Sequence, residues 1–279
     1  MLTLSQQARF ALSELGVPPH KKFGQHFLVD PTVINNMIRA AQISPESIVL
    51  EIGPGLGALS GTLANIAAQL YLVEVDAILA DRLRKQLADN ASVQVISADF
   101  LTLDLTATFP APSIQVVASL PYNVATPILF RLLENRRQFP EATVMLQKEV
   151  AERLSAVPGT KAYGIPSVLT QLYATVTTVC TVGPRSFFPA PKVESQIVRL
   201  MFQDAPRVAV KDERVFQRVV KAAFAQRRKT LRNALRAEGY GDLEAVSVRA
   251  GIDLQRRGET LGVEEFATLA DVLATQSHA

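Results

Sequence analysis

The sequence predicts an α/β protein in which a mostly parallel β-sheet with an antiparallel edge precedes a small all-helical domain. Three observations predict this class. Short apolar runs alternate with helical patterns between residues 48 and 155, a glycine-rich turn joins the first strand to its helix, and only helical periodicity follows residue 206. Because the composition changes around residues 203–207, we expect two domains, 1–205 and 206–279.

The first strand is expected at residues 48–52, where an apolar, β-branched run ends at glycine. A turn with Gly53, Gly55 and Gly57 follows, and residues 58–68 have the pattern of a helix. Glycine allows a backbone to turn tightly and to approach a ligand closely. The start of a helix adds unpaired N–H groups and the positive end of its dipole. This strand, turn and helix therefore predict a site for a ligand built on adenosine.

The glycine turn alone fits two classes of enzyme. Gly53, Gly55 and Ala58 match the dinucleotide fingerprint of dehydrogenases. Glu51 and the third glycine instead match the first motif of methyltransferases that use S-adenosyl-L-methionine. Glu74 ends the next apolar run, 21 positions after Gly53, where both classes place a carboxylate that binds ribose hydroxyls. A packing turn with a surface glutamate is the alternative that needs no ligand.

The alternation of strands and helices continues in order after Glu74. Further elements are expected as helices at 77–87, 126–135 and 149–155 and as strands at 93–96, 114–118 and 142–146. β-Branched runs at 175–182 and 196–202 flank a proline-rich loop and predict the antiparallel edge. Residues 1–15 fit a short amphipathic helix better than a signal peptide. The C-terminal domain is expected to contain helices at 213–225, 230–237, 243–250 and 263–273.

Composition excludes several classes of protein. The single cysteine, Cys180, excludes an internal disulfide and a cysteine-based metal cluster, and its β-branched surroundings predict a buried strand position. The three histidines are scattered at 20, 26 and 278, so we expect no metal site. No apolar run approaches the roughly 18 residues of a membrane-spanning helix. We therefore expect a cytoplasmic protein that does not bind membranes.

The net charge of +3 is concentrated in residues 206–279, which contain 13 basic and 10 acidic residues. Seven basic residues fall within positions 218–236 with no acidic residue between them: Arg218, Lys221, Arg227, Arg228, Lys229, Arg232 and Arg236. Such a run is usually a solvated helix face. Cations without a compensating carboxylate repel one another unless an anion lies against them, so we predict a phosphate-backbone contact by Arg227, Arg228, Lys229 and Arg232.

A candidate ligand-binding residue or segment follows each of four predicted strands. These are the glycine turn, Glu74, Asp99 and the segment Ser119-Leu120-Pro121-Tyr122. In an open α/β sheet the carboxyl ends of the strands form the ligand-binding edge. These residues are therefore expected to line one crevice.

The segment Ser119-Leu120-Pro121-Tyr122 indicates the reaction. A polar residue, an apolar residue, proline and an aromatic residue are typical of enzymes that methylate the exocyclic amine of a base. The lone pair of that amine is delocalised into the ring, and acceptors from one side chain and one backbone carbonyl can localise it. Tyr122 offers a face on which a base stacks, worth about 1–3 kcal/mol in comparable sites. Positioning then carries much of the catalysis without a strong general base. An ordinary strand-ending turn is the alternative.

From about Lys21 to Arg236 the sequence resembles the ribosomal small-subunit RNA adenine dimethyltransferases. Seven ordered motifs carry the resemblance: residues 22–28 (KFGQHFL), 51–59 (EIGPGLGAL), 120–127 (LPYNVATP), 147–153 (QKEVAER), 158–164 (PGTKAYG), 187–193 (FFPAPKV) and 226–232 (QRRKTLR). Seven motifs in this order are far more specific than any one of them.

The resemblance implies a Rossmann-like methyltransferase domain that uses S-adenosyl-L-methionine. It implies transfer of two methyl groups to N6 of each of two adjacent adenosines in the 3′-terminal hairpin loop of small-subunit rRNA. The expected partner is the immature small subunit, and we expect a monomer. By matching position, the residues expected around the cofactor are His26, Leu28, Gly53, Gly55, Glu74, Asp99 and Ser119. In that family the glutamate binds ribose and the aspartate accepts from the adenine amine.

Two positions within the motifs carry specific expectations. Phe187 resembles the second wall of a base-stacking slot opposite Tyr122, and a hydrophobic plug under the loop is its alternative. Ser119 stands where the family usually has asparagine, and a serine hydroxyl is a shorter acceptor than an amide oxygen. Loss of one well-placed hydrogen bond can slow an enzyme roughly tenfold to a thousandfold. Slower turnover, or stalling after one methyl group, is therefore a hypothesis for this chain.

Three other functions remain open at this point. A large-subunit rRNA adenine methyltransferase of the antibiotic-resistance type shares the catalytic motifs. A ribosome-assembly factor with weak catalysis would account for Ser119. A nicotinamide dehydrogenase shares the glycine turn but gives no role to the Leu-Pro-Tyr segment or to the basic stretch.

Overall fold

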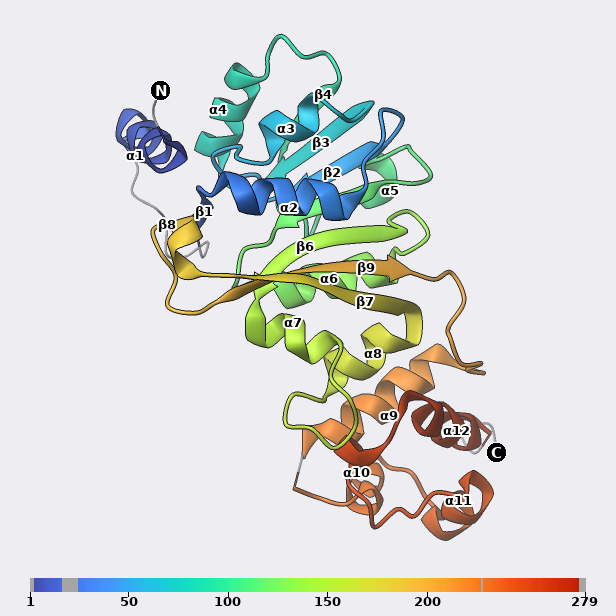
Figure 1. Cartoon of the computed structure of the whole chain (residues 1–279). Coiled ribbons are helices and arrows are strands. Elements are labelled where there is room, and N and C mark those ends of the chain that lie inside the picture. The colour runs from blue at the N-terminus through green and yellow to red at the C-terminus, as the bar shows by residue number, and fades with distance from the viewer. Residues whose placement is uncertain (1–2, 17–24, 227, 276–279) are drawn as a thin grey trace. The chain divides into compact units, whose positions relative to one another are not determined.

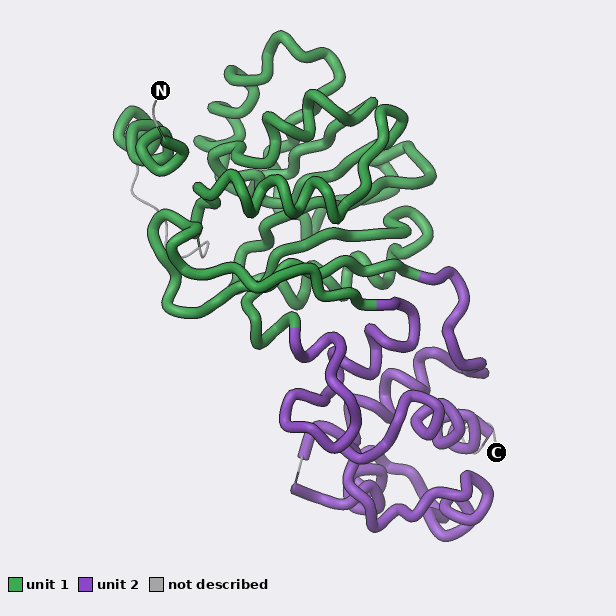
Figure 2. Tube along the Cα trace, in the orientation of Figure 1, with its two compact units in different colours: residues 1–151, 176–202 green, residues 152–175, 203–279 purple. Residues whose placement is uncertain are grey.

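A computed structural model describes residues 3–16, 25–226 and 228–275 of the chain (Figure 1). The chain forms two compact units, which are residues 1–151 with 176–202 and residues 152–175 with 203–279 (Figure 2). The chain passes from the first unit into the second for the last time between residues 202 and 203, near the predicted boundary at 205. Residues 152–175, which we expected in the first domain, group with the C-terminal helices because helix α8 (Ile165–Tyr173) packs against them.

The first unit is built on a seven-stranded sheet with the strand order β4-β3-β2-β5-β6-β9-β7. Its strands are β2 (Ile48–Ile52), β3 (Gln69–Glu74), β4 (Val93–Ser97), β5 (Gln115–Ser119), β6 (Glu141–Gln147), β7 (Ala174–Val182) and β9 (Ser195–Phe202). Strands β4, β3, β2, β5 and β6 pair in parallel, and β9 pairs antiparallel with β6. This topology confirms the predicted parallel sheet with an antiparallel edge. Cys180 lies in β7 as predicted, but it is only partly buried.

Helices cover the sheet and bury its apolar strands. Helix α2 lies on one face and α6 on the other (Figure 1). The helices of this unit are α1 (Leu4–Leu15), α2 (Pro31–Ala41), α3 (Ser60–Ala64), α4 (Ala77–Gln86), α5 (Leu105–Thr108) and α6 (Ala125–Glu134), and α7 (Lys148–Leu154) leads into the second unit. Asp30 caps α2 and Asp76 caps α4 through side-chain bonds to backbone N–H groups. The core between α2, α3 and the sheet includes Met37, Leu63 and Ile197, all fully buried.

A small second sheet joins distant parts of the chain. Strand β1 (Phe27–Leu28) pairs antiparallel with β8 (Phe187–Phe188), which follows a short 3-10 helix, η2 (Pro184–Ser186). Helix α1 packs beside these strands, with Leu12 against Phe27 and Leu79. The N-terminal segment and the proline-rich loop are thereby held together.

In the residues that the structure describes, the second unit contains α8 and four further α-helices. These are α9 (Glu213–Ala225), α10 (Leu231–Ala237), α11 (Leu243–Ala250) and α12 (Val263–Ala274), with a 3-10 turn η3 (Gly258–Thr260) before the last. Their apolar faces meet around Phe216 and Phe266, both fully buried. All four helices occupy the predicted segments. Within the described part of the chain, no helix is long and apolar enough to span a membrane.

Candidate active site

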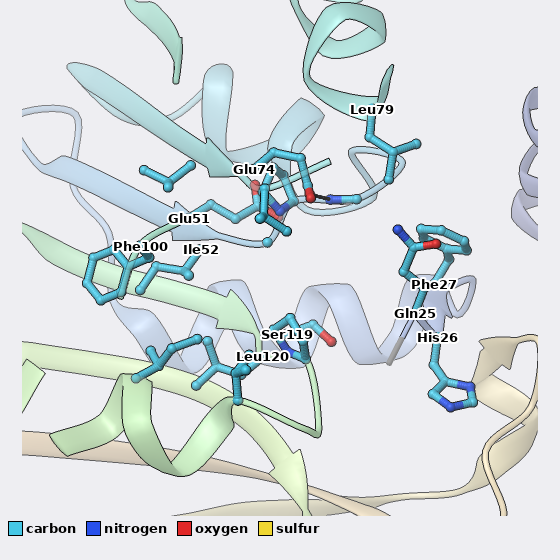
Figure 3. Close-up of a pocket in the computed structure, with 18 of the residues that line it drawn as sticks. Gln25, His26, Phe27, Glu51, Ile52, Glu74, Leu79, Phe100, Ser119 and Leu120 are labelled. Carbon is cyan, nitrogen blue, oxygen red and sulfur yellow. Dashed lines mark hydrogen bonds between the residues drawn. The ribbon is translucent and has the colours of Figure 1, made fainter. Parts of the chain in front are cut away.

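A cavity of about 200 Å³ opens at the carboxyl ends of β2, β3, β4 and β5 (Figure 3). All the residues singled out from the sequence for cofactor binding line it: His26, Leu28, Gly53, Gly55, Glu74, Asp99 and Ser119. Leu120, Pro121 and Tyr122 complete the wall at the end of β5. No group of three or more histidine, cysteine, aspartate or glutamate residues in the described ranges could hold a metal ion.

The glycine turn forms the floor of the cavity and needs its glycines. Gly53, Gly55 and Gly57 have φ angles of 68°, 58° and 85°, in the left-handed region that side chains disfavour. A Cβ on Gly55 would lie 3.0 Å from the Phe27 ring, and one on Gly53 would lie 3.3 Å from the Pro121 ring. The turn is therefore a close-fitting cradle between these two side chains.

The helix after the turn is shorter than predicted. We expected it over 58–68, whereas α3 covers only Ser60–Ala64. Residues 58 and 59 belong to a turn over 55–59, and at its other end the helix stops at the Asn65 cap, after which residues 65–68 lead into β3. The N–H groups of the three glycines bond within the protein: Gly53 donates to the Val73 carbonyl, Gly55 to the Glu74 carboxyl and Gly57 to the Pro54 carbonyl.

Glu74 is fixed at the end of β3 by two backbone donors. Its Oε2 accepts from the N–H of Gly55 at 2.9 Å, and its Oε1 accepts from the N–H of Asp76 at 3.0 Å. Burial raises the pKa of this carboxyl, and the two backbone hydrogen bonds lower it. The carboxylate is thus held in one orientation at the cavity wall.

Glu51, the first residue of the methyltransferase motif in the sequence, is a second buried carboxyl in the cavity lining. It is 2% exposed, and the hydroxyl of Ser60 donates to its Oε2 at 2.6 Å. Burial raises its pKa to about 8, against the effect of the Ser60 hydrogen bond and with the help of the nearby Glu74 charge. An acidic residue inside an otherwise apolar strand was the signal for this group in the sequence.

Tyr122 is half-buried and lies in the turn that follows β5. Its ring faces the ring of His26 with centroids 5.4 Å apart and an angle of 31° between the planes. Its hydroxyl lies 2.5 Å from the Ser195 hydroxyl, and burial raises its pKa. The turn itself is anchored because the N–H of Leu120 donates to the carbonyl of Met145.

Phe187 lies in the small β1–β8 sheet at the start of the proline-rich loop. It is absent from the cavity lining and only 4% exposed, and it packs with Leu28 and Val33 in the core under the loop. The pairing of Phe187 with Leu28 in the small β1–β8 sheet places the Phe187 side chain in this core. This burial is consistent with the hydrophobic plug of the alternative interpretation, and a role for Phe187 as the second wall of the base-stacking slot stays a prediction. Phe188 is more exposed, with the Arg9 guanidinium 4.6 Å above its ring.

The basic stretch lies in the second unit, on α9, on α10 and in the loop that joins them. Arg227 falls outside the described residues. Arg228 and Lys229 are exposed. Arg232 donates to Glu244 at 2.7 Å, so a carboxylate distant in sequence balances its charge. RNA contact by this stretch stays a prediction. Unbalanced positive charge predicts such a contact for Arg228 and Lys229 rather than for Arg232.

A parallel sheet covered on both faces, with the glycine cradle and the Leu-Pro-Tyr turn together at its carboxyl ends, is the arrangement of a Rossmann-like methyltransferase. Comparison with known families makes the assignment more specific. The model of the ribosomal RNA adenine dimethylase family matches residues 18–275, so the chain belongs to this family.

Relatives and solved structures agree with this membership. The chain is 46% identical over 257 residues to ribosomal RNA small subunit methyltransferase A of Syntrophotalea carbinolica, covering 91% of this chain and 97% of that protein. It is 47% identical over 261 residues to the protein of the same name from Geobacter sulfurreducens, covering 91% and 95%. A dimethyladenosine transferase from Plasmodium falciparum superposes with a TM-score of 0.70 at 25% identity, covering 88% and 96%. The 23S rRNA methyltransferase ErmE does so with 0.66 at 29% identity, covering 89% and 99%.

Proposed function

We propose that this protein transfers methyl groups from S-adenosyl-L-methionine to N6 of two adjacent adenosines in the 3′-terminal hairpin loop of small-subunit rRNA. The observation that carries the proposal is the Ser119-Leu120-Pro121-Tyr122 turn, which lies in the same cavity as the glycine cradle and Glu74. Family membership and identities of 46% and 47% to small-subunit methyltransferases support it. The substrate is the immature small subunit, the protein acts as a cytoplasmic monomer, and the reaction belongs to subunit maturation.

The residues present fit the proposed cofactor. Gly53 and Gly55 line the cavity and, without a Cβ, let Pro121 and Phe27 pack directly on the turn, which gives the adenosine-bearing ligand a tight backbone cradle. Glu74, held by two N–H groups, offers carboxylate oxygens to ribose hydroxyls, and Asp99 offers an acceptor to the adenine amine. S-adenosyl-L-methionine supplies, when bound, a methyl group on a positively charged sulfur.

The chain's own contribution is to bind and orient the target base. Tyr122 provides a face for stacking, which is worth about 1–3 kcal/mol per base in comparable sites. The Ser119 hydroxyl and a backbone carbonyl of the turn accept from the two amine hydrogens and localise the nitrogen lone pair. Pro121 stiffens the turn that presents these groups. Orientation of the amine nitrogen, rather than a strong general base, then lowers the barrier.

Two alternatives make different predictions for substrate. A large-subunit enzyme is consistent with the similarity to ErmE, but the 29% identity of that match is well below the values for the small-subunit relatives. An assembly factor with weak catalysis would bind immature small subunits without modifying them. Ser119, in place of the usual asparagine, is the residue that favours this second alternative.

Incubation with labelled S-adenosyl-L-methionine and unmethylated ribosomal subunits tests the proposal. Small and large subunits are offered separately, and the labelled nucleotides are mapped. We expect label at two adjacent adenosines near the 3′ end of small-subunit rRNA. Label in large-subunit rRNA, or binding of small subunits without label, would replace the proposal with one of the two alternatives.

A further inference from the structure

A buried hydroxyl in the antiparallel edge of the sheet contacts the candidate base-stacking residue. Ser195 is the first residue of β9 and is fully buried, opposite Gln147 at the end of β6. Its Oγ lies 2.5 Å from the Tyr122 Oη, across 73 positions of sequence. Because a buried hydroxyl is costly to leave without a partner, this pair links the Tyr122 ring to the sheet edge.

Tyr122 is also supported beside its ring. The ring of His26 lies at 5.4 Å from it, and the His26 Nδ1 lies 2.7 Å from the Pro189 carbonyl oxygen. A carbonyl oxygen only accepts, so Nδ1 carries the proton of this bond, which fixes the imidazole against the proline-rich loop. The Tyr122 hydroxyl is therefore bound by Ser195 of β9. The Tyr122 ring faces His26, which is bound by Pro189 of the proline-rich loop.

We propose that Ser195 is a positioning residue for methyl transfer, whose hydroxyl sets the orientation in which Tyr122 stacks on the target base. The inference rests on the function proposed above. The Tyr122 Oη lies on the Cγ–Cζ axis, so its bond to Ser195 fixes the direction of that axis. The His26 ring beside it limits rotation about the axis, and the two contacts together set the plane that a base meets. Transfer between a sulfonium and an amine nitrogen depends on alignment, and a displacement of about 1 Å at a reacting centre can cost on the order of a hundredfold in rate.

The Ser195–Tyr122 bond can be removed from either side. Ser195→Ala removes one hydroxyl, and Tyr122→Phe removes the other while it keeps the ring. We expect each to lower the single-turnover rate of methyl transfer by roughly tenfold to a hundredfold, with little change in S-adenosylhomocysteine binding. The double variant should be no slower than the slower single variant, because both substitutions remove the same bond.

Ser167→Ala is the matched control for the loss of a buried serine hydroxyl. Ser167 is also fully buried, and its Oγ donates to the Arg153 carbonyl at 2.6 Å within the second unit. The Ser167 Oγ also accepts from the Gly164 N–H at 3.0 Å, so Ser167→Ala should lose at least as much thermal stability as Ser195→Ala. Only Ser195→Ala should slow methyl transfer.

A spectroscopic readout separates positioning from general destabilisation. A hairpin RNA carries 2-aminopurine at a target adenosine, and its fluorescence falls when the base stacks. The chain has no tryptophan, so excitation beyond the tyrosine band reports the base alone. We expect wild type and Ser167→Ala to alter this fluorescence equally on binding, and Ser195→Ala and Tyr122→Phe to alter it less.

The outcomes distinguish the two proposals. If wild type methylates small subunits and Ser195→Ala matches Ser167→Ala in both rate and fluorescence, the positioning role is overturned. Additive losses in the double variant would overturn it as well. If wild type itself transfers no methyl group, the proposed function fails, and the fluorescence comparison still decides whether Ser195 orients Tyr122. Should Ser195→Ala fail to fold, Tyr122→Phe alone tests the same bond.

Discussion

Glu51 and Glu74 lie at the same edge of the sheet, yet their carboxyl groups have different partners. Glu74 accepts two backbone N–H bonds, whereas Glu51 accepts from one serine hydroxyl in a fully enclosed position. The fewer donors and deeper burial account for the pKa of about 8 at Glu51. Near neutral pH this residue is therefore protonated in the folded protein.

This protonation makes stability depend on pH in a definite direction. The folded protein keeps the Glu51 proton up to about pH 8, while the unfolded chain loses it near the ordinary value of 4.5. The free energy of unfolding therefore falls as pH rises between these values, with a slope approaching about 1.4 kcal/mol per pH unit for this group. Glu51→Gln should remove that slope, so its stability relative to wild type should rise from pH 5 to pH 8.

Chemical denaturation at several pH values measures this difference. The same substitution at the exposed Glu46 serves as control and should leave the pH profile of stability unchanged. A constant difference between Glu51→Gln and wild type over this range would show that Glu51 is ionised in the folded protein.

The residues of the site could be predicted where the topology alone decides their place. Glu74, Asp99 and Ser119 each follow a parallel strand, so they had to meet at one edge of the sheet. Phe187 could not be placed this way, because its burial depends on the pairing of β8 with β1 about 160 positions away. Ser195 gave no signal, since a serine at the start of a strand is common and its partner is set by tertiary structure.

At the scale of elements, the glycine turn determines the shape of the cavity. Gly55→Ala places a Cβ at 3.0 Å from Phe27 in a left-handed backbone position. We expect a loss of about 1–3 kcal/mol of stability from the strained backbone, and a smaller thermal shift on adding S-adenosylhomocysteine.

Gly61→Ala is the matched control, because Gly61 lies in α3 without a positive φ, and a Cβ added there would have no neighbour within 4 Å. The same added methyl group should there be neutral or stabilise by up to about 1 kcal/mol. If both variants bind S-adenosylhomocysteine like wild type, the turn is not part of the cofactor site.

Strands and C-terminal helices could be predicted closely because their apolar periodicity is strong and glycine, proline or aspartate marks their ends. Helix α9, for example, begins after its Asp212 cap at the residue expected. Two kinds of element gave no usable pattern. Helix α8 is buried over most of its length and has few polar positions to define a face. Strands β1 and β8 contain two residues each, too few for a period of two, and exist through their mutual pairing.

At the scale of the whole molecule, the separation into two units predicts separable binding and catalysis. Replacing Arg228 and Lys229 by alanine should weaken binding to the rRNA hairpin and reduce its dependence on salt. Each lost phosphate contact should lower the slope of log affinity against log salt by about 0.7–0.9. Affinity for S-adenosylhomocysteine should stay the same, because these residues belong to the second unit and the cavity to the first.

A charge-matched control replaces Arg39 and Lys85, two exposed basic residues of the first unit, by alanine. If this control reduces the affinity and the salt slope equally, general charge rather than the basic stretch accounts for RNA binding. The comparison is made by titrating hairpin RNA at several salt concentrations.

Methyl transfer in this cavity requires Tyr122 to hold a target adenine beside the methyl donor. Mass spectrometry of the 3′-terminal loop, from small subunits treated with wild type or with Tyr122→Ala, is the sharpest test of this requirement. We predict two methyl groups on each of the two adjacent adenosines with wild type, and a large loss of methylation with Tyr122→Ala while binding to the subunit persists. Equal losses of methylation and binding, or full methylation by Tyr122→Ala, would contradict it.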